Sequence, residues 1–323
     1  MPNSKLTIPI IYFAVWLAPL QMYGACPAAL AAGPQAEDYY QFSFPPRDIA
    51  AQIVFNVIYK DLKGQTRTRE DRVLARGNFN LPKAAPLTIY FKPPAQNCMD
   101  SVEKLKVCHV KQIDMHNMDF DDNHVMHLKD FKELTYLNLY GTLVSDKILP
   151  LVGKFSQLNL LKLSRSEVTG TTFAELCHLK KLKSLFCANT ALKKGTVAAL
   201  KPLCPQLYRL DIARTTLSKE DVAVVQYLTN AEVLDISHNT AIDDSCTKYL
   251  TGLKKLKTLY IEDTQITDKS LPTLLKLPAL DRIFVRTAEF WRSTGKPINT
   301  GRVRVLDISD HSDAPLETFS PLH

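Results

Sequence analysis

The chain has 323 residues, of which 46% are hydrophobic and 23% are charged, and its formal net charge at pH 7 is +7. This length and apolar content are sufficient for a large buried core, and they exclude a chain that is disordered along its whole length. The mild positive charge permits an acidic partner without requiring nucleic acid.

The first 31 residues have the three parts of a secretory signal peptide. Lys5 supplies a positive start, residues 6–20 are apolar, and Ala29-Leu30-Ala31 offers a cleavage site between small residues. We therefore expect residues 1–31 to be removed and the chain to be secreted or held in the periplasm or cell envelope. Two alternatives stay open. Cys26 could carry a lipid, although a tyrosine stands where such a site usually has leucine, and an uncleaved anchor would need more than fifteen apolar residues.

Residues 32–97 differ from everything that follows them. The stretches 51–62 and 86–94 are rich in β-branched and aromatic residues and are bounded by breaks that contain Pro or Gly. This composition is typical of strands and turns. We predict a small β-rich N-terminal module that covers the open edge of the next segment. A separate recognition role for this module stays open.

From about Val110 to Arg286 the sequence repeats itself every 24 or 25 residues, and residues 98–109 lead into this array. In the unit Leu134–Gln157, leucine fills positions 1, 4 and 6, and these positions are apolar in the other units too. The alternation predicts a short strand with its apolar side chains in a core. A small polar residue at position 9, such as Thr142, predicts a turn, and apolar residues three and four apart then predict a helix.

One such unit cannot bury its own apolar face, so we expect the units to stack. The residues at position 4 should then lie on adjacent parallel strands. They are Ile113, Leu137, Leu161, Leu185, Leu210, Leu234, Leu259 and Ile283.

The repeat resembles the leucine-rich repeat family, in particular its ribonuclease-inhibitor-like, helix-containing branch. The variants TQITD, TLVSD and SEVTG are similar to the short bacterial repeats of this family. The resemblance implies an α/β solenoid with a curved parallel sheet on its concave face and helices on its convex face. We assign residues 98–310 to this solenoid, including a C-terminal cap strand, and residues 311–323 to a tail. Because the family often has a disulfide-tied cap, a disulfide between Cys98 and Cys108 is also expected.

The sequence contains no signature of catalysis. It has no glycine-rich phosphate loop, no G-x-S-x-G and no H-E-x-x-H motif. Four histidines lie between His109 and His127, but the repeat register separates His116, on the strand side, from His124, on the helix side. We therefore predict that the chain is not an enzyme and binds neither a metal nor a cofactor.

Positions 3, 5, 7 and 8 of each unit should face the concave side, where they form a mixed surface that contains many Tyr, Phe and Arg residues. These residue types dominate the energetics of protein interfaces. The predicted protein-binding residues are Tyr136, Asn138, Tyr140, Arg165, Phe186, Arg209, Asp211, Arg214, Asp235, Tyr260, Glu262, Arg282 and Phe284.

The leading hypothesis is a non-catalytic scaffold, secreted or associated with the envelope, that recognises a protein or peptide through this concave face. An alternative is a structural or adhesive envelope component that contacts an anionic glycan or lipid through a lysine ridge, which comprises Lys180, Lys181, Lys183, Lys254, Lys255 and Lys257. No aromatic residues alternate with these lysines, which disfavours nucleic acid. A further alternative, implied by resemblance alone, is the substrate-receptor subunit of a ubiquitin ligase. The leader and the β-rich module argue against it.

Overall fold

A computed structural model gives the fold, and it describes residues 38–45, 51–60, 65–92, 99–297 and 299–307. The predicted signal peptide, the possible lipid site at Cys26 and the tail at 311–323 lie outside the described residues. Within the described residues, no helix is both long enough and apolar enough to cross a bilayer.

The repeats form a ladder of parallel strands, as predicted. Residues at position 4 pair directly from one strand to the next, for example Leu137 with Leu161 and Leu210 with Leu234. The same register continues to Ile283. The strands of the ladder are β6 (Val110–Asp114), β7 (Tyr136–Asn138), β8 (Leu160–Lys162), β9 (Ser184–Phe186), β10 (Arg209–Asp211), β11 (Val233–Asp235), β12 (Thr258–Tyr260), β13 (Arg282–Val285) and β14 (Arg304–Asp307).

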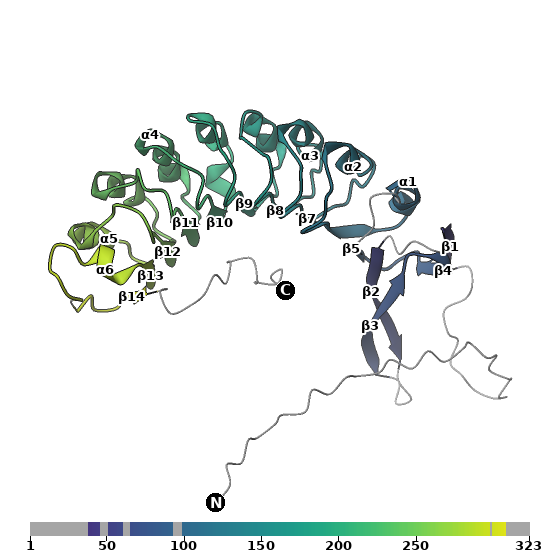
Figure 1. Cartoon of the computed structure of the whole chain (residues 1–323). Helices are drawn as coiled ribbons and strands as arrows, with labels where there is room; N and C mark the ends of the chain where they lie inside the picture. The colour runs from purple at the N-terminus through teal and green to yellow at the C-terminus, as the bar shows by residue number, and fades with distance from the viewer. Residues whose placement is uncertain (1–37, 46–50, 61–64, 93–98, 298, 308–323) are drawn as a thin grey trace, which may run out of the picture. The chain divides into compact units, whose positions relative to one another are not determined.

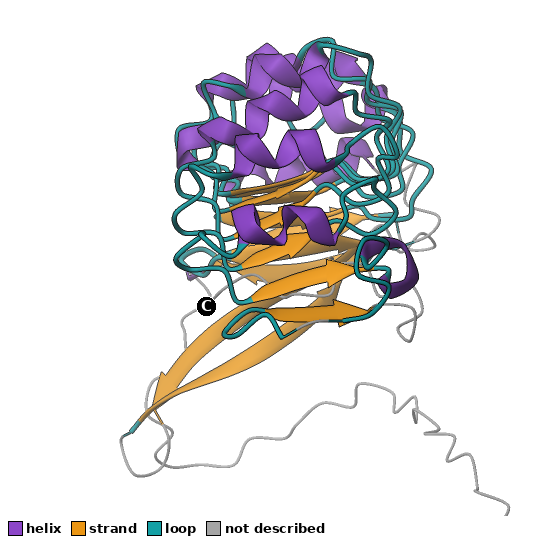
Figure 2. Cartoon of the chain, turned by 90° about the vertical axis from the view of Figure 1, so that its left-hand side faces the viewer, coloured by secondary structure: helices purple, strands orange, loops and turns teal. Residues whose placement is uncertain are grey.

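The helical part of each repeat lies on the opposite side from the strands (Figure 1), and the two layers stack along the array (Figure 2). These segments are short pieces of α-helix or 3-10 helix, three to seven residues long, because a unit of about 24 residues retains few residues after its strand and two turns. They are α1 (Met99–Glu103), η3 (Lys104–Val107), α2 (Asp122–Met126), η4 (Asp146–Ile148), α3 (Leu149–Val152), η5 (Phe173–His178), η6 (Thr196–Leu200), η7 (Cys204–Gln206), α4 (Lys219–Val222), η8 (Ala223–Tyr227), η9 (Asp244–Leu250), η10 (Asp268–Ser270), α5 (Leu271–Leu274) and α6 (Thr287–Phe290).

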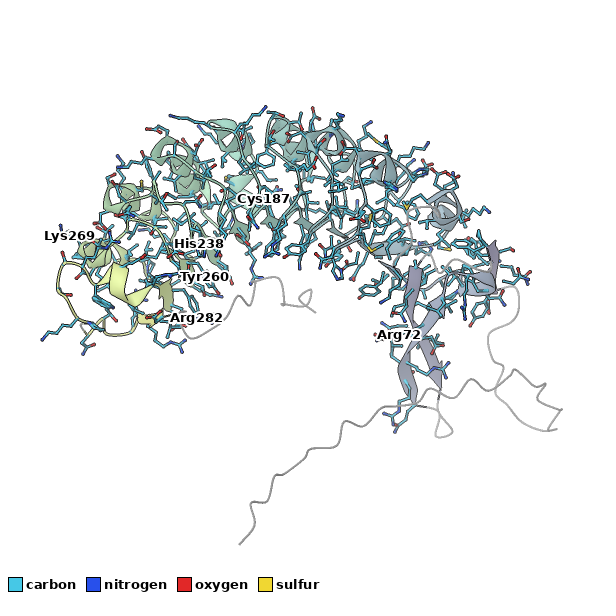
Figure 3. All side chains as sticks on the ribbon, viewed as in Figure 1. Arg72, Cys187, His238, Tyr260, Lys269 and Arg282 are labelled. Atoms are coloured by element: carbon cyan, nitrogen blue, oxygen red, sulfur yellow. The ribbon has the colours of Figure 1, made fainter. Side chains whose placement is uncertain are left out.

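The core fills the space between the two layers. Positions 1, 4 and 6 contribute buried leucines and isoleucines from the strand side, and Phe155 and Phe173 contribute rings from the helix side. Cys187, which occupies position 6 of its unit, is fully buried between the layers (Figure 3). The repeat positions read from the sequence are therefore the inward-facing positions of the fold.

Position 9 closes the turn after each strand with a side-chain hydrogen bond. The hydroxyls of Thr142, Thr190 and Thr264 each donate to the carbonyl oxygen of position 6, three residues earlier, at 2.6–2.7 Å. Asn239 occupies this position where the unit carries an extra residue. Its Oδ1 accepts from the backbone N–H groups of Thr215 and Leu217 at 3.2 and 3.0 Å, so it links two repeats.

A second ladder explains the Ser/Thr-Asp pairs that recur at the helix starts. Asp122 accepts hydrogen bonds from the N–H and the hydroxyl of Ser145 in the next repeat, both at 2.7 Å. Asp244 accepts from the same two groups of Thr267 at 2.7 and 2.8 Å. The Ser or Thr also caps its own helix, as Ser145 does. Each pair therefore ties a helix start to both neighbouring repeats.

Residues before the ladder form the strands β1 (Tyr39–Phe44), β2 (Ala51–Lys60), β3 (Thr66–Leu74), β4 (Gly77–Pro82) and β5 (Leu87–Phe91). β1 pairs with β4, whereas β5 pairs in parallel with β6 and antiparallel with β2, so the main sheet has 12 strands in the order β14 to β5, then β2 and β3. Phe91 packs edge-on against Phe120 of the first repeat at a ring separation of 5.1 Å. The β-rich segment thus covers the first repeat by continuing its sheet.

The other end of the array is closed by β14 and by Arg302. β14 pairs in parallel with β13, and the Arg302 guanidinium donates to the backbone carbonyls of Leu277 and Leu280 in the last complete repeat. The insertion between β13 and β14 is held by Asp268, which accepts from the N–H groups of Ser293 and Thr294 at 3.0 and 2.8 Å.

Candidate binding surface on the strand side

The predicted binding residues all belong to strands β7–β13 or to the turns that directly follow them. They divide into two sets by burial. Five of them are between 1% and 7% exposed: Asn138, Phe186, Asp211, Asp235 and Glu262. These five cannot present a whole side chain to a partner, so their first role is to support the surface.

Three of the five buried residues shape the end of the strand. The side-chain oxygens of Asn138, Asp211 and Asp235 accept from the backbone N–H two residues ahead, at 3.0, 3.1 and 2.9 Å. This local hydrogen bond is a known way for Asn and Asp to turn a chain. Sequence position alone could not separate this structural use from a binding role.

The remaining predicted residues are partly or fully exposed, and their cations and aromatic rings contact one another and the buried ring of Phe186. The Arg165 guanidinium lies 5.5 Å from the ring centroid of Tyr140, and that of Arg209 lies 5.8 Å from the ring of Phe186. The rings of Tyr260 and Phe284 stack face to face, with centroids 4.4 Å apart and planes 4° apart. These three contacts hold large side chains in fixed positions on the strand side, where a partner would meet them.

Position 8 of the repeat adopts a left-handed backbone conformation along the array. Asn117, Gly141 and Asn189 have φ values of 53°, 65° and 55°, as expected for residue types that tolerate this region. Arg165 and Arg214 also stand there, at 54° and 53°. A long side chain in this region costs on the order of 1 kcal/mol. The two arginines therefore stand at a position where Asn or Gly would be less strained.

A chain of polar contacts crosses four repeats at the end of the strands. Arg214 Nη2 lies 3.2 Å from His238 Nε2, His238 Nδ1 lies 2.7 Å from Asp263, and Arg286 contacts the same carboxylate at 2.7 and 3.0 Å. Burial and the nearby Arg214 lower the pKa of His238, while Asp263 acts in the opposite direction. A neutral His238 can accept from Arg214 and donate to Asp263, which fits this order of contacts.

Glu262 stands at position 7, where the three repeats before it have the small residues Ala188, Ala213 and Ser237. Its carboxyl group is buried, and its Oε2 has no hydrogen-bond partner among the described residues. Burial and the adjacent Asp235 raise the pKa of Glu262 well above 4.5, and burial also raises the pKa of Asp235. A carboxyl that keeps its proton can be buried more readily than a carboxylate.

At the N-terminal end of the surface, Tyr136 is half-buried and its hydroxyl donates to Asp114 Oδ2 at 3.3 Å. Burial and the charge of Asp114 raise the pKa of Tyr136. His116 also contacts Asp114, whereas His124 contacts Asp121 and His127 contacts Glu103. Each histidine has its own carboxylate, and the described residues contain no group of three His, Cys, Asp or Glu placed to hold a metal ion.

The lysine ridge lies at the turns that lead into the strands, and its members contact neighbouring repeats. Lys255 Nζ donates to Asn230 at 2.7 Å, Lys257 pairs with Glu232 at 2.8 Å, and Lys183 lies 5.0 Å from the ring of Tyr208. Lys180 donates to the carbonyl of Cys177 at 2.9 Å. These contacts give the ridge a structural role.

The predicted disulfide cannot be placed, because Cys98 lies outside the described residues, and it stays a prediction; Cys108 is buried. Arg304 is a surface residue that the sequence interpretation missed. It lies directly opposite Arg282 in the register of the paired strands β13 and β14. The strand-like sequence VRVLD, residues 303–307, could have indicated its position on a strand. The insertion before that stretch breaks the repeat register, so position 3 of the last unit could not be assigned.

No family model matches the sequence, and no curated protein matches it. Solved structures do match. Internalin C2 of Listeria monocytogenes aligns with a TM-score of 0.52 and 18% identity, over 66% of this chain and 92% of that chain. A second internalin of that bacterium, inlF, aligns with a TM-score of 0.41 and 16% identity, over 57% of this chain and 64% of that one.

The ectodomain of the Arabidopsis receptor kinase HAESA, solved in complex with an N-terminally extended IDA peptide hormone ligand, aligns with a TM-score of 0.46 and 19% identity, over 56% of this chain. This chain spans 31% of that receptor chain and 64% of inlF, so each of those proteins is matched over less than two thirds of its length. Identities this low establish the fold alone. The chain has the leucine-rich repeat solenoid fold, which confirms the fold class predicted from the repeat.

Proposed function

We propose that this leucine-rich repeat solenoid is a non-catalytic scaffold that binds a protein or peptide through its strand side. The observation that carries the proposal is the pre-ordered layer of arginines and aromatic rings, with the Tyr260–Phe284 stack at 4.4 Å and Arg165 over Tyr140 at 5.5 Å. Rigid aromatic and arginine side chains are enriched among the residues that dominate interface energetics.

Two arginines at left-handed positions strengthen the proposal. Backbone strain that persists in a protein is concentrated at functional sites, because there it is retained for a reason other than stability. Arg165 and Arg214 carry this strain and are both exposed on the strand side.

The proposed location of the protein and its branch of the repeat family rest on the sequence only. Secretion or envelope attachment is supported by the leader-like residues 1–31, and the ribonuclease-inhibitor-like, bacterial type by the TQITD-like repeats. Glycan or lipid adhesion through the lysine ridge is less well supported, because Lys255 and Lys257 bond to Asn230 and Glu232. Nothing in the contacts described above favours a ubiquitin-ligase receptor.

The test begins with crosslinking of the full chain in the cells that make it, followed by identification and purification of the partner. Tyr140, Tyr260 and Phe284 are then replaced together by Ser. We expect partner affinity to fall at least about tenfold, since interface anchors of this kind contribute about 2 kcal/mol or more each.

The matched control replaces three other exposed apolar side chains, Met126, Leu143 and Tyr208, by Ser. This control variant should bind as tightly as the original chain. Circular dichroism and thermal unfolding check that both variants fold. Equal affinity of the strand-side variant and the control variant would reject the proposed surface.

A further inference from the structure

The C-terminal part of the strand side exposes guanidinium groups and buries three of its acids. Arg282, Arg286 and Arg304 have side chains that are 44%, 52% and 61% exposed, and Arg214 is exposed as well. On the same side of the same repeats, Asp211, Asp235 and Glu262 are all buried. Figure 3 shows Arg282 beside Tyr260 on the inner side of the array, away from Lys269.

The carboxylates that do reach this surface are outnumbered by the arginines around them. Asp281 contacts Arg304 at 2.6 Å and Arg282 at 3.5 Å. Asp263 contacts Arg286 at 2.7 Å and is linked to Arg214 through His238. Asp281 is thus shared between two guanidinium groups, and Asp263 lies between Arg286 and the His238–Arg214 pair. In each set two arginines accompany one carboxylate, which leaves one net positive charge.

The buried acids, Asp211, Asp235 and Glu262, lie too deep to reach the surface themselves. Glu262 lies beside Asp235 in a buried setting that favours its protonated form. The half-buried Tyr260–Phe284 stack lies on the same strands as Arg282 and provides an apolar floor between the cations. The surface therefore combines guanidinium groups, each of which can donate two parallel hydrogen bonds, with a stacked pair of aromatic rings.

We propose that strands β10–β14 bind an acidic polypeptide segment, with carboxylates paired to Arg214, Arg282, Arg286 and Arg304 and an apolar side chain on the Tyr260–Phe284 stack. This inference rests on the proposed function and specifies where on the strand side the partner docks and its chemistry. Guanidinium groups match carboxylates in two-point geometry. The aromatic floor favours a polypeptide over a sulfated glycan, which has no comparable apolar side chain.

The test uses the full chain and a fluorescent peptide in which glutamates alternate with phenylalanine. Binding is followed by fluorescence anisotropy at low and high salt. We expect the peptide to bind, to bind more weakly as salt rises, and to lose at least about tenfold in affinity when Arg282→Glu and Arg286→Glu are combined. The matched control combines Lys254→Glu and Lys255→Glu on the lysine ridge, which makes the same change in net charge and should leave affinity unchanged.

Three outcomes would overturn the inference: no binding of the glutamate peptide, an equal loss in the lysine control, or binding of a sulfated oligosaccharide in preference to the peptide. Thermal unfolding confirms that both variants fold, and Arg282→Lys combined with Arg286→Lys should retain part of the affinity. If the natural partner requires Tyr260 and Phe284 but tolerates the arginine reversal, the proposed function stands and this inference fails. If binding of the natural partner requires neither the two aromatic residues nor the arginines, the proposed function itself fails.

Discussion

The strand-side residues serve two different purposes that the repeat pattern places at the same positions. Asp211 and Asp235 turn the chain, whereas Arg209 on β10 and Tyr260 on β12 are partly exposed on the same face. Burial separates the two groups, and burial depends on which side chains stand on the adjacent repeats. Two predictions concern single residues of this surface.

The first prediction concerns the proton on Glu262. Its folded-state pKa is raised by burial and by Asp235, so the folded state holds a proton that the unfolded state releases near pH 4.5. The contribution of Glu262 to stability should therefore be greatest at low pH and should fall as pH rises through its folded-state pKa. Glu262→Gln should flatten this fall and stabilise the chain at alkaline pH by on the order of 2 kcal/mol. Urea unfolding from pH 5 to pH 9 measures both effects, and parallel curves for the two proteins would contradict the prediction.

The second prediction concerns the left-handed backbone at Arg165. Replacement by Gly removes the Cβ that opposes this conformation, whereas replacement by Ala keeps it, and both replacements lose the contact with Tyr140. We expect the Gly variant to be more stable than the Ala variant by about 1 kcal/mol. Chemical denaturation of the pair provides the measurement. If Ala proves equal or better, position 8 is not strained.

At the scale of elements, the strands and helices are too short to be stable alone, and lateral hydrogen bonds hold them. Asp146 shows this most clearly. It accepts from the N–H groups of Thr169 and Gly170 at 3.1 and 2.9 Å and from the hydroxyl of Thr171 at 2.9 Å. Burial opposes its charge, but these donors prevail and lower its pKa.

Asp146→Ala should therefore destabilise the fold by about 2–3 kcal/mol at neutral pH, because several donors lose one charged acceptor. A lowered folded-state pKa contributes stability above 3.8 that is lost as pH falls through the folded value. The difference between the two proteins should shrink in acid. Asp119→Ala, at an exposed position, is the control and should change stability by less than about 0.5 kcal/mol. A similar loss in the control would refute the role of the ladder.

At the scale of the whole molecule, each repeat contacts mainly its neighbours, so stability is distributed along the array and its ends depend on their caps. The N-terminal end is covered by β5 and Phe91. The C-terminal end is covered by β14 and by the contacts of Arg302 with the carbonyls of Leu277 and Leu280.

Loss of the Arg302 cap should loosen only the end that it covers. In Arg302→Ala, amide hydrogen exchange in β13 and β14 should accelerate, while β7–β9 keep their protection, since opening propagates from the freed end. Arg292→Ala, which removes an exposed contact with Gln265, serves as the control and should leave exchange unchanged. Uniform acceleration along the array would show that the repeats unfold as one unit.

The sequence by itself determined the solenoid, because a 24- or 25-residue period with apolar residues at positions 1, 4 and 6 has one way to bury them, by stacking in register. The same pattern predicted that positions 3, 5, 7 and 8 face the concave side and that position 9 forms a turn. It therefore indicated the strand side as the surface on which to look for a partner. The Ser/Thr-Asp pairs were visible, but their bonds join residues about 24 positions apart and needed the stacked repeats.

Only the tertiary structure decided which strand-side residues are available. Phe186 is as prominent in sequence as Phe284, yet it lies buried beside Lys162 and Arg209, while Phe284 stacks half-exposed on Tyr260. Glu262 looked like a surface acid and is a buried one. The physical reason is lateral packing: a side chain's exposure depends on the residues one repeat away on either side, and periodicity along the chain does not encode how those particular side chains fit together.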